Sequence, residues 1–278
     1  MNCLNKQTTG LTRNAIDKFY TKPSISELCL ELFEKKVKID KNKDYFIEPS
    51  AGNGSFSNLM YKKYDNCLFY DIDPENVSTE YNIIKQDYLD LDLHLDNKVH
   101  LIGNPPFGRQ SSLARKFIKK SATFCDTISF ILPKSFKKDS FQKTFPLNFH
   151  LIYQYDLPEN SFLIDGKEYD VPCVFQIWVK KKNKRKVKKK EIPKYFSFVK
   201  KGDNPDLSFR RVGVYAGKID KNYKNKSIQS HYFIKLNDNI NLDTFLERYS
   251  KIRFENNNTV GPKSICKPEL IEMLNKMF

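Results

Sequence analysis

Apolar and polar positions alternate along the first 180 residues with two different periods. Residues 24–36 place apolar side chains at 25, 28, 29, 32 and 33, on one helical face, which predicts a helix with Ser24 as its N-cap. Farther along, short apolar runs alternate with segments of helical periodicity. The runs predict strands at 45–47, 67–70, 99–102, 128–132, 150–155 and 174–179, and the segments between them predict helices at 56–64 and 111–121. This order predicts an α/β fold with an open, largely parallel sheet that binds its ligand at the carboxyl ends of the strands.

The pattern breaks at Lys180–Lys190, where nine of eleven residues are cationic. Such a run is a solvated linker or hairpin tip, an arm that follows phosphates, or a nuclear-import signal, and these interpretations are not exclusive. Beyond it, strands are predicted at 195–199, 211–215 and 232–236, with a helix after Pro268. The chain is therefore predicted to comprise a domain at 1–180, a basic linker at 181–192 and a small α+β appendage at 193–278.

The charge balance narrows the possible partners. Lys and Arg number 48 against 33 Asp and Glu, a formal net charge of +15, which favours nucleic acid ahead of an acidic membrane surface. No apolar run reaches about 18 residues and the first residues lack a secretory core, so we expect an intracellular protein, cytoplasmic or nuclear, that does not enter a membrane. Six scattered cysteines indicate reduced thiols, and four histidines without ligand spacing predict no metal site.

A glycine turn follows the strand predicted at 45–47. Glu48 stands four residues before Gly52, Gly54 completes a Gly-x-Gly turn, and Asp71 ends the next strand 19 residues after Gly52. The glycines let the backbone turn tightly against a ligand, and an acid at this distance reaches ribose hydroxyls in dinucleotide-type folds. The three features together predict a nucleotide-type cofactor site.

A second motif, Asn104-Pro105-Pro106-Phe107, follows the strand predicted at 99–102. The prolines stiffen the loop and lack backbone donors, so carbonyl groups and the Asn104 side chain are acceptors beside an aromatic ring, which suits a planar amine. In this order the two motifs resemble those of S-adenosylmethionine-dependent methyltransferases that modify the N6 amine of adenine. Their signature is Asn/Asp-Pro-Pro-Tyr/Phe after Glu/Asp-x-x-x-Gly-x-Gly.

The resemblance covers about residues 12–180 and implies a Rossmann-like class I methyltransferase sheet that binds S-adenosylmethionine. It implies that the cofactor-binding residues are Tyr20, Thr21, Pro23, Glu48, Ser50, Gly52, Gly54, Asp71, Ile72, Asp87, Tyr88 and Asn104. It implies a catalytic loop of Asn104, Pro105, Pro106 and Phe107. There Asn104 Oδ1 and the Pro105 carbonyl would accept hydrogen bonds from the amine while Phe107 stacks on the base, so no catalytic Ser, Cys, His or metal is required.

Substrate contacts are expected from further aromatic and basic residues. The candidates are Phe162 and Phe175 as a second wall of the base pocket, Arg109 and Lys134 near the loop, and Arg210 and Arg211 in the appendage. We expect methylation of adenine N6 in nucleic acid, with DNA favoured. Phe107 replaces the Tyr of many DNA enzymes, so RNA stays open. Methylation of a protein glutamine and an inactive, nucleic-acid-binding subunit are further alternatives.

Overall fold

The computed structural model describes residues 19–74, 80–187, 190–254 and 263–277. The chain forms two compact units, within residues 12–186 and 187–278, and each is described by itself. The division falls inside the cationic run. Within the described residues, no helix is long and apolar enough to cross a membrane.

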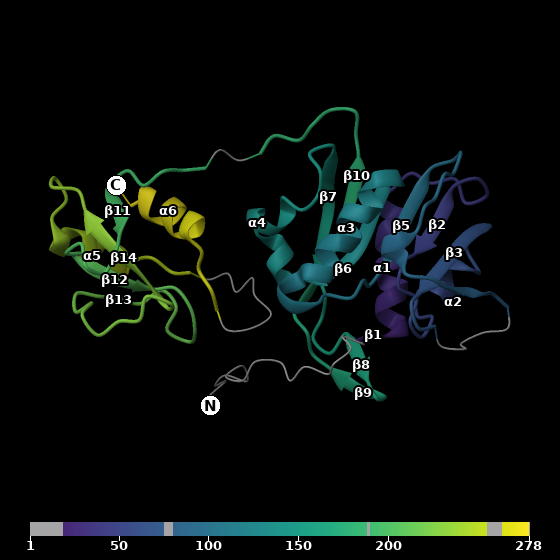
Figure 1. Ribbon diagram of the computed structural model, residues 1–278, viewed down its shortest axis with the longest axis horizontal. Coiled ribbons are helices and arrows are strands. Elements are labelled where there is room, and N and C mark those ends of the chain that lie inside the picture. The colour runs from purple at the N-terminus through teal and green to yellow at the C-terminus, as the bar shows by residue number, and fades with distance from the viewer. Residues whose placement is uncertain (1–18, 75–79, 188–189, 255–262, 278) are drawn as a thin grey trace. The chain divides into compact units, whose positions relative to one another are not determined.

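The N-terminal unit is built on a seven-stranded sheet with the order β4-β3-β2-β5-β6-β10-β7 (Figure 1). The strands are β2 (Tyr45–Glu48), β3 (Asn66–Asp71), β4 (Ile83–Lys85), β5 (Val99–Gly103), β6 (Thr127–Pro133), β7 (Phe149–Asp156) and β10 (Cys173–Lys180). The first five strands in this order are parallel, and β10 runs antiparallel to both neighbours. The prediction of an α/β, Rossmann-like methyltransferase sheet is confirmed. Parallel strands of this kind are covered on both faces, and accordingly every residue of β5 and β6 is buried.

The helices of this unit lie in the connections between strands. They are α1 (Pro23–Lys36), α2 (Ser57–Met60), α3 (Ser112–Phe124) and α4 (Asp139–Gln142), with one-turn 3₁₀ helices η1 (Tyr88–Asp90), η2 (Arg109–Ser111) and η3 (Lys134–Lys137). Two predictions need correction. Helix α1 begins at Pro23 with Lys22 at the N-cap, because proline at the first helical position has the required φ and no unpaired N–H. Helix α2 is one turn long, not the nine residues predicted at 56–64.

A second, three-stranded sheet joins two distant segments of the chain. Strand β1 (Tyr20–Thr21) pairs with β8 (Phe162–Ile164), which forms a hairpin with β9 (Lys167–Tyr169). Figure 1 shows this sheet beyond the ends of the central strands. The pairing fixes the segment that precedes α1 at one edge of the unit.

The cationic run is held against the N-terminal unit as far as Arg185. The Arg185 guanidinium donates to four backbone carbonyls, of Gln142 (3.0 Å), Phe145 (2.8 Å), Pro146 (2.5 Å) and Phe149 (2.7 Å). It also lies over the Trp178 ring, 5.3 Å from the centroid. The interpretation of the run as a solvated linker is therefore wrong at Arg185, because the guanidinium of Arg185 is hydrogen-bonded to carbonyls of the N-terminal unit. The lysines from Lys180 to Lys186 are exposed.

The C-terminal unit contains a four-stranded antiparallel sheet with the order β11-β14-β12-β13. Its elements are β11 (Phe196–Val199), β12 (Leu207–Arg210), β13 (Ile219–Asp220), β14 (His231–Leu236), α5 (Leu242–Ser250) and α6 (Lys267–Asn275). Phe209, Ile234, Phe245 and Leu270 are fully buried in its core.

Two sequence predictions fail in the C-terminal unit. The strand predicted at 211–215 is wrong, because the chain leaves β12 after Arg210 and turns at Gly213, where φ is +93°. Helix α5 was not predicted, although Asn241 accepts from the amides of Asp243 and Thr244 as an N-cap should.

A buried histidine makes the stability of the N-terminal unit depend on pH. His100 is 1 % exposed, with Nδ1 2.9 Å from Thr127 Oγ1 and Nε2 3.1 Å from Asp44 Oδ2. Burial lowers the pKa of His100, although the Asp44 carboxylate partly opposes this. Because the unfolded chain takes up this proton near pH 6.5 and the folded chain resists it, the free energy of unfolding should fall between pH 7 and pH 5.

We expect the free energy of unfolding of His100→Gln to depend less on pH than that of the wild type, with a slope lower by at most about 1.4 kcal/mol per pH unit. The measurement is denaturant unfolding at each pH. His94→Gln is the matched control, because the His94 side chain is 93 % exposed. Equal slopes for wild type and His100→Gln would show that His100 does not couple folding to protonation.

Candidate active site

A cavity of about 760 Å³ opens at the carboxyl ends of β2, β3 and β5. This lies within the range of about 300–1,000 Å³ that is typical of small-molecule sites. Its wall contains most of the residues predicted to bind the cofactor and all four of the predicted catalytic loop. They are Tyr20, Thr21, Glu48, Ser50, Gly52, Asp71, Ile72, Asp87, Tyr88, Asn104, Pro105, Pro106 and Phe107. Segments far apart in the sequence meet here because parallel strands end at one edge of the sheet.

The glycine turn brings backbone close to this cavity. Gly52 has φ +52°, and its amide donates to Asp71 Oδ2 at 2.8 Å. A Cβ at Gly52 would lie 3.2 Å from the Tyr20 ring, so glycine is required both for the dihedral and for the approach. Gly54 is buried behind the wall, where its amide closes the turn on the Ala51 carbonyl at 2.8 Å. Its place is in the turn, and it does not line the cavity.

Two carboxylates in the cavity wall, Asp71 and Asp87, accept hydrogen bonds from backbone amides. Asp71 Oδ1 accepts from the Asp73 amide at 2.9 Å, and Asp87 Oδ1 accepts from the Leu89 amide at 2.9 Å. A carboxylate has about four acceptor positions, so each side chain can also accept from ligand hydroxyl or amine groups. The amide contacts fix the orientation of both groups.

A third carboxyl group, Glu48, is buried in the cavity wall with only 2 % of its surface exposed. Burial raises the pKa of Glu48 well above its ordinary value, and the charge of Asp71 adds to this, while hydrogen bonds from Ser57 partly oppose it. The Ser57 hydroxyl donates to Glu48 Oε2. A cationic ligand group beside Glu48 would lower this pKa again and favour the ionised carboxylate. The end of the cavity at Glu48 is therefore suited to a positive charge.

Asn104 is held by its amide nitrogen and presents its oxygen. Asn104 Nδ2 donates to the Phe19 carbonyl at 3.1 Å and to Thr21 Oγ1 at 3.2 Å, both on or beside β1. The Ser50 hydroxyl donates to the Asn104 backbone carbonyl at 3.1 Å. Asn104 Oδ1 is buried and has no hydrogen-bond partner among the described residues. An unpaired buried acceptor is costly, so its presence in a cavity wall points to a donor on the ligand.

Three stacked rings continue the wall beside Asn104. Phe107 stacks on Phe19, with ring centroids 6.4 Å apart and planes at 27°, and Phe19 stacks on Tyr169 at 5.7 Å and 25°. Phe19 is not among the predicted site residues, although its position before the Tyr20-Thr21 pair was a usable signal. Phe107 and Phe19 both line the cavity.

Phe162 and Phe175 do not form the predicted second wall of the base pocket. Both are 0 % exposed, and neither lines the cavity. Phe162 packs edge-on against Phe19 at 6.4 Å, and Phe175 lies in β10 between β6 and β7. A phenylalanine at an inward position of a strand is buried by its neighbours, and the sequence did not show which face would point inward.

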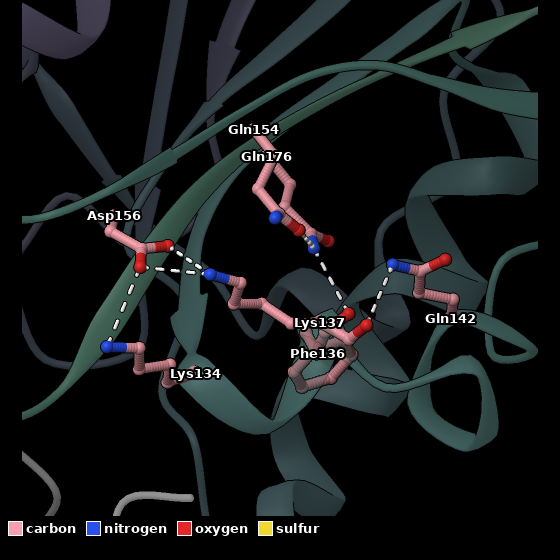
Figure 2. A network of polar contacts seen from close by, with 7 residues as sticks. All are labelled: Lys134, Phe136, Lys137, Gln142, Gln154, Asp156 and Gln176. Atoms are coloured by element: carbon pink, nitrogen blue, oxygen red, sulfur yellow. Dashed lines mark hydrogen bonds and ion pairs between the residues drawn. The ribbon is translucent and has the colours of Figure 1, made fainter. Parts of the chain in front are cut away.

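Two other predicted residues of the N-terminal unit, Pro23 and Lys134, are not in the cavity wall. Pro23 begins α1, and Lys134 ion-pairs with Asp156 at 3.6 Å, beside Lys137 at 2.8 Å (Figure 2). Arg109 does line the cavity, whereas Arg210 and Arg211 belong to the C-terminal unit. Several lining residues were not predicted, among them Asn53, Ser55, Leu113 and Phe117. Leu113 and Phe117 looked like ordinary apolar positions of a helix, so no local signal set them apart.

The polar contacts drawn in Figure 2 join η3 to strands β7 and β10. Gln176 Nε2 donates to Gln154 Oε1 at 2.7 Å and to the Phe136 carbonyl at 3.1 Å. Gln142 Nε2 donates to the Lys137 carbonyl at 3.4 Å. These bonds fix η3 on β7 and β10 and leave Lys134 and Lys137 engaged with Asp156.

The profile of a known family, described as the EDM2 methyltransferase-like domain, matches residues 39–199, more than half of the chain. The chain belongs to this family. Its domain is thus a class I S-adenosylmethionine-dependent methyltransferase-like domain. No match was found among curated proteins.

Solved structures similar to this EDM2 methyltransferase-like chain share little sequence with it. A proposed RNA methyltransferase from Pyrococcus horikoshii is 15 % identical, with a TM-score of 0.48, over 63 % of this chain and 93 % of that one. A proposed class I S-adenosylmethionine-dependent methyltransferase from Listeria monocytogenes is 19 % identical, with a TM-score of 0.45, over 58 % and 60 %. The N-methyltransferase NodS from Bradyrhizobium japonicum is 9 % identical, with a TM-score of 0.41, over 56 % and 94 %.

S-adenosylmethionine, which the methyltransferase fold implies, fits the residues of the EDM2-like cavity. The cofactor carries cationic ammonium and sulfonium groups, and the buried Glu48 carboxyl favours a cation. It also carries ribose hydroxyls and an adenine amine, which are donors for the oriented carboxylates of Asp71 and Asp87. Around the cavity, and throughout the described residues, no three His, Cys, Asp or Glu side chains gather as a metal site would require.

Replacing Asp71 should weaken cofactor binding. Asp71→Ala removes an acceptor for hydroxyl groups and releases the Gly52 amide, so we expect the Kd for S-adenosylmethionine in titration calorimetry to rise about tenfold or more. Asp92→Ala is a control with an 89 % exposed side chain and should bind as wild type does. Unchanged affinity in Asp71→Ala would remove Asp71 from the cofactor site.

Proposed function

We propose that this chain transfers a methyl group from S-adenosylmethionine to the N6 amine of adenine in nucleic acid, with DNA favoured over RNA. The observation that carries the proposal is the buried, unpartnered Asn104 Oδ1 in the wall of a cavity that fits the cofactor. An acceptor in this position recognises an N–H donor, and the exocyclic amine of adenine is one.

The residues of the loop account for the activation of such an amine. An aryl amine is a poor nucleophile because its lone pair is conjugated with the ring. Hydrogen bonds to Asn104 Oδ1 and to the Pro105 carbonyl would favour a pyramidal nitrogen and localise the lone pair. The bonds from Nδ2 to Phe19 and Thr21 keep the Asn104 side chain from rotating, so its acceptor is fixed in advance. When bound, S-adenosylmethionine would supply an electrophilic methyl group: the C–S bond breaks as the N–C bond forms, S-adenosylhomocysteine leaves, and the amine proton passes to solvent.

Phe107 and Phe19 support recognition of a planar base. Phe107 lines the cavity and stacks on Phe19, so a base bound against Phe107 would extend an existing stack. In a duplex the target adenine would have to leave the helix, at a cost of a few kcal/mol. The net charge of +15 favours a polyanionic substrate, and Arg109 supplies a cation at the cavity itself.

The proposal predicts that Asn104→Ala loses methyl transfer while it still binds the cofactor. We expect the rate to fall about a hundredfold or more, because one acceptor at the reacting amine is removed. Asn104→Asp keeps an oxygen at this position and should retain more activity than the alanine variant. The measurement is transfer of labelled methyl to matched DNA and RNA, followed by digestion and mass spectrometry of the nucleosides.

Asn66→Ala is the control variant. Asn66 begins β3, which ends at Asp71, and the one side-chain hydrogen bond of Asn66 among the described residues goes to the Asn42 carbonyl. N6-methyladenine in one polymer alone would support the reaction and identify that polymer as the substrate. Near-normal turnover in Asn104→Ala would contradict the catalytic role. Bound cofactor with no methylated nucleoside in either polymer would favour a protein amide or an inactive, nucleic-acid-binding subunit instead.

A further inference from the structure

The C-terminal unit contains a hollow of its own, of about 170 Å³. It is lined by Arg210, Tyr215, Lys218, Asp220, Lys226 and His231. Four of these six side chains are basic. The core of the unit lies elsewhere, so these residues are not needed to fill it.

Strand pairing places the hollow at the ends of three strands. Arg210, the last residue of β12, is directly opposite His231, the first residue of β14. The chain from Arg210 to Lys218 closes on itself, because the Arg210 amide donates to the Lys218 carbonyl at 2.8 Å and the Gly217 amide donates to the Arg210 carbonyl at 2.8 Å. Side chains from β12, β13 and β14 therefore meet at one place by register.

The single acid of the hollow is already engaged. Asp220 Oδ2 pairs with Lys226 Nζ at 2.6 Å, and Oδ1 accepts from the Asn222 amide at 2.9 Å. Among the described residues, neither Arg210 nor Lys218 forms an ion pair. Arg210 Nε donates to the Val212 carbonyl at 3.2 Å, which holds the guanidinium in position. In the part of the unit that the structure describes, Arg210 and Lys218 thus keep their positive charges without an acid in ion-pair contact.

His231 adds a charge that depends on pH. It is 8 % exposed, and its Nδ1 lies 3.2 Å from the Ser227 carbonyl and 3.0 Å from Ser230 Oγ. Because a carbonyl oxygen only accepts, we infer that Nδ1 carries the hydrogen of the neutral ring. Burial lowers the pKa of His231, and the charges of Arg210 and Lys226 lower it further, against the opposing charge of Asp220. A bound anion would reverse this effect and favour the protonated ring.

We propose that this hollow binds a phosphodiester group of a nucleic-acid strand through Arg210, Lys218 and His231, with the Tyr215 ring stacking on an adjoining unpaired base. The inference rests on the proposed function, for which it supplies a substrate contact outside the cavity. Guanidinium and ammonium groups gathered in a small hollow suit the several oxygens of a phosphate. Tyr215 is 67 % exposed at the hollow, and aromatic rings beside cations form the usual surface for single-stranded nucleic acid.

The test is binding of short single-stranded DNA and RNA oligonucleotides to the full chain, by fluorescence anisotropy over a series of salt concentrations. In the double variant Arg210→Gln/Lys218→Gln, we expect the Kd to rise about tenfold at low salt and the salt slope to fall by about two. Lys221→Gln/Lys235→Gln removes two exposed cations of the same unit outside the hollow and should change the Kd by about twofold or less.

The pH dependence gives a second readout. Wild-type affinity should rise as the pH falls from 7.5 to 5.5, because binding favours protonated His231. His231→Gln should lose this dependence and should bind more weakly than the wild type at pH 5.5. An unchanged pH profile in His231→Gln would remove His231 from the site.

The outcomes separate this inference from the proposed function. Oligonucleotide binding and methyl transfer by the wild type, with the Arg210/Lys218 variant binding as its control does, would overturn the phosphate site alone. Weakened binding in that variant, with no N6-methyladenine formed by the wild type, would support the site and overturn the proposed function. No affinity of the wild type for either polymer would overturn both.

Discussion

Two hydrogen bonds from Asn104 Nδ2, to the Phe19 carbonyl just before β1 and to Thr21 in β1, orient the Asn104 side chain in the cavity wall. These bonds occupy both N–H donors of the Asn104 side-chain amide, so its oxygen is the group left to contact a ligand. They also require β1 to be in place, and β1 is held by its pairing with β8. The position of the Asn104–Phe107 loop therefore depends on a hairpin about 60 residues downstream in the sequence.

Electrostatics along the cavity follow from burial more than from the number of charges. Glu48 is enclosed by the sheet and the glycine turn, and burial raises its pKa. Asp71 and Asp87 are oriented by backbone amides and lie where hydroxyl or amine donors can reach them. The cavity thus offers carboxyl groups to cationic groups and to hydrogen-bond donors, and S-adenosylmethionine carries both.

The excess of basic residues is divided among different roles. Arg185 bonds four carbonyls and anchors the chain between the units, and Lys134 and Lys137 are paired with Asp156. Arg210 and Lys218 keep their charge in the hollow of the C-terminal unit. Composition alone could not make this division, because an ion pair or a carbonyl contact depends on which strands are neighbours.

The sequence by itself determined six of the seven strands of the central sheet, the glycine turn, the Asn104–Phe107 loop and most of the cavity wall. These features are local: apolar runs form strands, glycines allow tight turns, and parallel strands bring their carboxyl ends together. Only the tertiary structure decided that Phe162 and Phe175 are buried and that Phe19 and Phe117 line the cavity. It also decided that Arg210 and His231 share a hollow. Such facts depend on which face of an element packs inward and on strand register, and both are set by contacts between residues distant in the chain.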